Sequence, residues 1–89
     1  MMRLKVEMVG NGLHPNEAIV AVKGSTGLER LVVPRQSITD GSIEIGWPIR
    51  ENLTDHSALI ELPRETQSGA WRVWVPLDEI FEEKERMRA

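Results

Sequence analysis

GLERLVVPRQSI, residues 27–38, and GAWRVWVPLDEI, residues 69–80, decide the fold, because the two stretches align without a gap and share residues at five positions. The shared residues are a Gly, an Arg, a Val-Pro pair and a final Ile, in that order. Gly permits the backbone conformations of a tight turn, whereas Pro cannot donate to a sheet and so marks the end of a strand. Each stretch therefore predicts a strand that begins after a turn and stops at a Pro.

The similarity continues upstream of these two stretches. AIVAV, residues 18–22, lies over ALIEL, residues 58–62, at a separation of 40 residues instead of 42, so the second copy has a loop two residues longer. Insertions concentrate in loops, which supports the alignment. LKVEM, residues 4–8, and IEIGW, residues 43–47, share only the alternation of a half-buried strand. Two tandem three-strand repeats are predicted, at about residues 3–38 and 42–80, although unrelated amphipathic hairpins also look alike because strands use few residue types.

The whole pattern predicts one all-β domain over residues 1–89, long enough to bury a single core. Its six predicted strands form either a small barrel or an antiparallel sheet folded over on itself, since two copies cannot close a propeller. Turn residues separate the strands, as in Gly24-Ser25-Thr26-Gly27 and Asp40-Gly41. After Pro76 the apolar spacing becomes helical, with acidic residues early and basic residues late. A short C-terminal helix is predicted over about residues 77–87.

Strand alternation divides the side chains between two faces. The predicted core consists of Leu4, Val6, Met8, Val20, Val22, Leu31, Val33, Ile43, Ile45, Trp47, Ile60, Leu62, Trp71, Val73 and Val75. If each hairpin is symmetric about its loop, the opposite face contains four cross-strand pairs: Ile19 with Val32, Ala21 with Arg30, Leu59 with Trp74, and Glu61 with Arg72.

The outer face is more apolar than a solvent-facing sheet surface usually is. Its candidate partner-binding residues are Ile19, Val32, Leu59, Arg72 and Trp74. Trp and Arg are enriched at interaction hot spots, so a protein partner or a second copy of the chain is the predicted ligand. Two alternatives stay open: the C-terminal helix or a loop covers this face, or a register shift of one residue exchanges the two faces.

Composition excludes several classes of function. The chain has no Cys, which removes disulfides, thiolate metal sites and cysteine nucleophiles. The basic start of the chain is not followed by the apolar run of a signal peptide, so a cytoplasmic protein is predicted, and no run approaches the roughly 20 apolar residues of a membrane span. A net charge of −3 argues against nucleic acid as the partner.

The few chemistry-bearing residues do not form a recognisable catalytic pattern. Asp55-His56-Ser57 contains the residue types of a hydrolytic triad, but working triads bring together distant positions. His14 and His56 precede equivalent strands, so pseudo-symmetry would allow a metal site with Glu51 or Asp55, although the i, i+4 spacing of many metal sites is missing. We therefore predict no catalytic residues, no cofactor, no metal and no enzymatic activity.

Residues 27–45 resemble the hairpin of AbrB-type swapped-hairpin transcription regulators. The similarity lies in the Arg-x-x-Val-Pro step at residues 30–34 and the GSIEI strand at residues 41–45, and it covers about a fifth of the chain. In that family the first strand of the hairpin has the pattern Gly-Arg-Val-x-Ile-Pro, in which Val directly follows Arg. In this sequence a Leu-Val pair separates Arg30 from Val33. The resemblance implies phosphate contacts by Arg30, Arg35, Arg50 and Arg64. The sequence thus favours a non-enzymatic interaction module of unknown role, with a nucleic-acid-binding regulator as the alternative.

Overall fold

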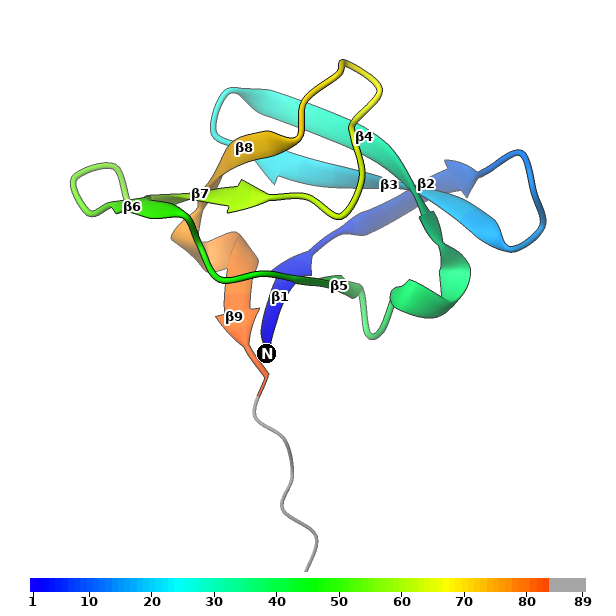
Figure 1. The fold of residues 1–89 in the computed structure, drawn as a ribbon, viewed down its shortest axis with the longest axis horizontal. Helices are drawn as coiled ribbons and strands as arrows, with labels where there is room; N and C mark the ends of the chain where they lie inside the picture. Colours follow the sequence, from blue (N-terminus) through cyan, green and yellow to red (C-terminus); the bar gives the residue numbers. More distant parts are fainter. Residues whose placement is uncertain (84–89) are drawn as a thin grey trace, which may run out of the picture.

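The computed structural model describes residues 1–83, which are mostly β (Figure 1). The strands are β1 (Met2–Lys5), β2 (Glu7–Asn11), β3 (Glu17–Gly24), β4 (Gly27–Pro34), β5 (Ser42–Ile45), β6 (Arg50–Asn52), β7 (Ser57–Glu61), β8 (Arg72–Pro76) and β9 (Ile80–Glu82). Two single 3₁₀ turns, η1 (Arg35–Ser37) and η2 (Leu77–Glu79), follow β4 and β8. The strands form three antiparallel sheets in the orders β2-β3-β4, β6-β7-β8 and β5-β1-β9.

Both hairpins have the predicted register. In the first, Ile19 pairs with Val32 and Ala21 with Arg30, and Gly24 pairs with Gly27 so that only two residues form the turn. In the second, the pairs are Leu59 with Trp74 and Glu61 with Arg72. The register prediction is confirmed because it depended only on alternation and on the turn residues, both of which are local properties.

Pro34 and Pro76 end their strands in the same way. Pro34 has φ −61° and ψ 137°, Pro76 has φ −59° and ψ 142°, and a 3₁₀ turn follows each of them. The next residue donates its N–H to the loop before the paired strand: Arg35 to Asn16 at 2.7 Å, and Leu77 to His56 at 2.8 Å. The aligned Val-Pro steps therefore occupy matching elements, while a common origin of the two halves stays a prediction.

Strand β1 connects the two halves of the chain. It lies between β5 and β9, with Leu4 paired to Ile43 on one side and to Ile80 on the other. In Figure 1, β1 continues into β2 after a bend at Val6, whose N–H donates to the carbonyl of Gly41 at 2.9 Å. The strand predicted over residues 4–8 is therefore two strands that belong to different sheets.

The core lies among the three sheets and contains most of the predicted residues. Its buried members include Leu4, Val20, Val22, Leu31, Val33, Ile43, Ile45, Ile60, Leu62 and Val75, and Val6 and Val73 pack against them. The side chain of Arg3 is also buried, and its guanidinium donates to the Ser42 hydroxyl at 2.7 Å and to the Ser42 carbonyl at 2.9 Å. These bonds satisfy a buried charged group that would otherwise be costly.

Three predicted core residues are exposed: Met8 by 56%, Trp47 by 68% and Trp71 by 51%. Met8 lies on the edge strand β2 just before a bulge, Trp47 follows the end of β5, and Trp71 precedes the start of β8. Alternation places a side chain on the core face only while the strand continues over the core. The Trp71 indole instead donates to the Glu65 carboxylate at 2.9 Å.

Three predictions about the architecture are wrong. The sheets do not close into a barrel, and the described residues form nine strands instead of six. Residues 77–82 form η2 and β9, not the predicted α-helix, because Ile80 and Phe81 pair with the edge of β1 that β5 leaves open. A helix of only a few residues is marginally stable, so the hydrogen bonds gained by pairing with β1 outweigh the helical spacing of the apolar residues. The rest of the predicted helix lies outside the described residues.

Leu4→Ala is expected to destabilise the protein by about 2–5 kcal/mol, because a fully buried side chain on the strand shared by both halves leaves a cavity. Urea unfolding at unchanged m-value measures this loss. Trp71→Ala is the control, with an expected loss under about 1 kcal/mol for a half-exposed side chain. Equal losses in the two variants would contradict the assignment of the core.

Candidate functional site

The predicted partner-binding residues are divided between two sheets. Ile19 and Val32 are half-buried on β3 and β4, and Leu59 and Trp74 are half-buried on β7 and β8. Arg72 is exposed. The structure therefore pairs these residues as predicted, but it does not present them as one exposed apolar patch.

Each hairpin contacts the other through its connecting segment. The N–H of Ser25, in the first hairpin turn, donates to the Trp74 carbonyl at 2.7 Å. In the second hairpin loop, the N–H of Gln67 donates to the Arg30 carbonyl at 2.7 Å, and Ser68 donates to the Glu29 carboxylate at 2.6 Å. These reciprocal contacts occupy the outward edges of β8 and β4. Within residues 1–83, hairpin segments are thus what lies against these strand edges.

A hollow of about 580 Å³ adjoins Trp74 and is lined by Ser25, Thr26, Asn52, Asp55, Ser57 and Trp74. The side-chain oxygen Oδ1 of Asn52 accepts hydrogen bonds from the N–H groups of Thr54 and Asp55, and the Asn52 side-chain amide donates to the Asp55 carboxylate at 3.0 Å. These polar groups are engaged in forming the turn between β6 and β7. Two of the polar side chains that line the hollow, Asn52 and Asp55, are therefore engaged within the protein.

The triad-like run and the two histidines lie in loops or at the start of a strand. Asp55 bonds to Asn52, and His56 has a positive φ of 50° at the end of the turn before β7. His14 lies in the β2–β3 loop and His56 in the β6–β7 loop, which Figure 1 shows at opposite ends of the molecule. Across residues 1–83, no three potential ligands gather in a way that would hold a metal ion. A metal site built from both histidines is therefore excluded.

The most exposed tryptophan borders a groove that the sequence did not predict. This Trp47 groove has a volume of about 460 Å³ and is lined by Glu44, Ile45, Gly46, Trp47, Ile49, Glu61, Leu62 and Pro63. Trp47 is 68% exposed and Ile49 47% exposed, whereas Ile45 and Leu62 are buried core residues. The groove therefore combines solvent-exposed apolar walls with side chains fixed by the core.

The sequence around Trp47 explains its position. Strand β5 ends at Ile45, Gly46 follows, and Pro48 cannot donate a backbone hydrogen bond. The N–H of Ile49 then donates to the Leu59 carbonyl at 2.8 Å, which holds the chain beside β7. Trp47 is thus anchored on both sides by regular structure. The Trp-Pro pair was the available signal that the strand stops before Trp47, because the residue before Pro is restricted and Pro interrupts pairing.

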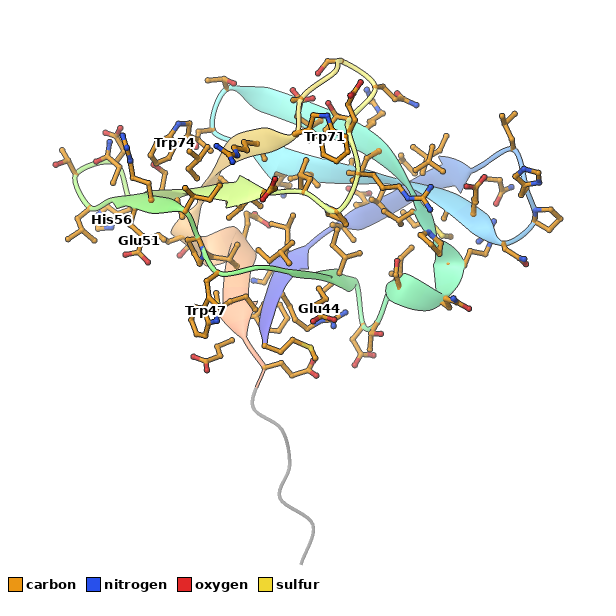
Figure 2. The ribbon with its side chains drawn as sticks, viewed as in Figure 1. Glu44, Trp47, Glu51, His56, Trp71 and Trp74 are labelled. Carbon is orange, nitrogen blue, oxygen red and sulfur yellow. The ribbon has the colours of Figure 1, made fainter. Side chains whose placement is uncertain are left out.

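Two glutamates give the Trp47 groove its charge. Glu44 and Glu61 are both exposed, and neither has an ion-pair partner within 4.0 Å in the part of the chain that the structure describes. No basic residue lines the groove. Figure 2 shows Trp47 and Glu44 below the ribbon of β5, whereas Trp71 and Trp74 lie in the upper part of the view. The Trp47 groove is therefore apolar and acidic.

The four arginines that the AbrB-type resemblance implies as phosphate contacts come from different elements of the fold. Arg35 donates to the Pro15 carbonyl at 2.9 Å and to the Asn11 side chain, and Arg64 lies 3.5 Å from the Glu17 carboxylate. Arg30 is on β4 and Arg50 on β6, in different sheets. Two of the four side chains thus have internal partners.

Comparisons of this chain with protein-family models, with curated proteins and with solved structures give no significant match. Among residues 1–83, no helix has the length and apolar character needed to cross a bilayer. Function is therefore inferred from the chemistry of the surfaces described above.

Trp47→Ala is expected to lower the free energy of unfolding by less than about 1 kcal/mol, because most of this side chain is already in water. Trp74→Ala is expected to cost clearly more, since half-buried aromatic area and the packing of β8 are lost. Urea unfolding of both variants makes the comparison. A larger loss for Trp47→Ala would show that its role is structural.

Proposed function

We propose that this protein is a non-enzymatic interaction module that binds a segment of a protein partner in the Trp47 groove. The observation that carries the proposal is a tryptophan exposed by 68% on a segment held at both ends by regular structure. Trp side chains in pockets are typical anchors of protein interfaces, because they bury a large area at a small entropic cost. The adjoining Ile49 and Pro63 enlarge the apolar surface.

The surface proposed from the sequence has weaker support. Its apolar members Ile19, Val32, Leu59 and Trp74 are already half-buried, so less area remains for a partner to cover. Hairpin contacts also occupy the neighbouring strand edges. These residues and Arg72 remain a candidate second surface, and a second copy of the chain remains a candidate ligand.

A tandem duplication is also proposed as the origin of the fold. It is supported by the matching Val-Pro ends, the matching 3₁₀ turns and the matching N–H bonds of Arg35 and Leu77. In the alignment of residues 4–8 with 43–47, Met8 lies over Trp47, and both are exposed. At this position only the second half carries a large aromatic side chain.

Selection from a displayed random-peptide library is the test of the proposed function. Peptides enriched on the wild-type protein are expected to bind Trp71→Ala equally well and to lose at least tenfold in affinity on Trp47→Ala, because only Trp47 lines the groove. Trp71 is a matched control, since it is also exposed and lies elsewhere on the surface. Absence of enrichment, or undiminished binding to Trp47→Ala, would refute the proposal.

The nucleic-acid alternative makes a separate prediction. Phosphate binding weakens steeply with salt because counterions are released, whereas binding through an apolar groove changes little. With a net charge of −3 and two of four arginines engaged internally, no binding to mixed-sequence duplex or single-stranded DNA is expected at physiological salt. Fluorescence anisotropy across a salt titration measures it. Micromolar binding that disappears in Arg30→Ala/Arg50→Ala would favour the regulator over the interaction module.

A further inference from the structure

We infer that the ligand of the Trp47 groove is an extended peptide segment that pairs with the outer edge of β5 and places a cationic side chain, Lys or Arg, over the Trp47 indole. The inference rests on the proposed function and adds the conformation and charge of the ligand. Three features carry it: the charge of the groove, the exposed aromatic face and the unpaired edge of β5.

The groove carries negative charge, which attracts a cationic side chain. Its charged residues are Glu44 and Glu61, and both carboxylates lack an ion-pair partner within 4.0 Å across residues 1–83. Arg72, directly opposite Glu61 in the hairpin register, does not line the groove and makes no ion pair with it at this distance. Arg64, next to the groove residue Pro63, lies 3.5 Å from Glu17. Arg3, directly opposite Glu44 on β1, is engaged by Ser42 and Glu83 and makes no ion pair with Glu44 within 4.0 Å. A basic ligand would therefore meet two carboxylates that have no ion-pair partner at this distance.

The exposed indole favours the same ligand. A Lys or Arg side chain over the face of an aromatic ring is attracted by the ring quadrupole, and Trp is the strongest such partner. The aliphatic stem of the same side chain can pack against the apolar walls formed by Ile49 and Pro63. A neutral apolar side chain would pack against the apolar walls but would not be attracted to the ring as a cation is. An acidic side chain would be repelled by Glu44 and Glu61.

The edge of β5 supports an extended conformation. In the order β5-β1-β9, β5 pairs with another strand, β1, on one side only. The backbone N–H and C=O of Ser42 point to the other side, where they bond to Thr39. Backbone groups alternate along a strand, so those of Glu44, two residues later, point to this outer side as well. A peptide strand added there gains main-chain hydrogen bonds, which is the usual mode of β-augmentation.

These features place the cation. A residue of the added strand that lies opposite Glu44 has its side chain on the same face as the Glu44 carboxylate, and opposite charges facing each other across strands are favourable. Trp47 comes three residues after Glu44, and both residues line the groove. Edge pairing, aromatic contact and carboxylate contact can therefore be made by one short peptide.

Nuclear magnetic resonance of the full ¹⁵N-labelled chain tests the inference with synthetic probes. The probe is acetyl-Ala-Val-Lys-Val-Ala-amide, with an Arg peptide as its equivalent, a norleucine peptide as the uncharged isostere, and an N-methylated backbone as the pairing-deficient form. The indole N–H signal of Trp47 is assigned from Trp47→Phe. The Lys and Arg probes are expected to shift this signal saturably, while the norleucine and N-methylated probes bind at least tenfold more weakly.

Charge removal provides the matched variants. Glu44→Gln/Glu61→Gln is expected to weaken the Lys probe at least tenfold and to leave the norleucine probe unchanged. Glu51→Gln/Glu82→Gln removes the same charge from exposed positions outside the groove, and wild-type affinity is expected. Urea unfolding verifies that both variants fold. Equal loss in the two double variants would show general electrostatics and overturn the cation site.

The remaining outcomes separate the inference from the function on which it rests. Equal binding of Lys and norleucine probes at the Trp47 signal would refute the cation and retain a peptide-binding groove. Undiminished binding of the N-methylated probe would refute the strand pairing. A Trp47 signal that shifts with protein concentration alone would identify a second copy as the occupant and overturn the inference. Failure of every probe, with no library peptide that depends on Trp47, would refute both proposals.

Discussion

Backbone pairing of β1, in the first half of the chain, with β5 and β9 from the second half is the interaction on which the remaining structure depends. Residues 2–5 bond to β5 on one edge and to β9 on the other, so a segment at the start of the described chain holds its middle and its end together. Arg3 reinforces the pairing with β5 through two bonds to Ser42. Contacts so distant in sequence form only after a large loop has closed, which makes them late and costly during folding.

The same pairing determines what β5 offers to solvent. Since β1 takes the inner edge of β5, its outer edge is exposed beyond the short bridge to Thr39. The chain must then leave β5 toward β6, and Gly46 and Pro48 direct it out of the sheet. Trp47 is therefore displayed beside an open strand edge. A large apolar side chain in this position contributes little to folding, which is the physical reason to look for a ligand there.

A different constraint acts on Trp74. The turn of the first hairpin bonds to its carbonyl, and the loop of the second hairpin bonds to Arg30, so each hairpin covers an edge of the other. This reciprocal contact protects two strand edges that would otherwise be open to aggregation. Trp74 thus contributes to the association of the hairpins, while Trp47, at a position with no such contact, is available to a partner.

Alternation and turn residues in the sequence determined the β character, both hairpin registers, the Pro ends of β4 and β8 and most of the core, because these depend on neighbouring residues. Only the tertiary structure decided where strands stop relative to the core, which exposed Met8, Trp47 and Trp71. It also made residues 80–82 a strand, since β1 supplied an unpaired edge that no local pattern reveals. The Trp47 groove depends on two segments separated in sequence, residues 44–49 and 61–63, which the backbone bond from Ile49 to Leu59 holds side by side.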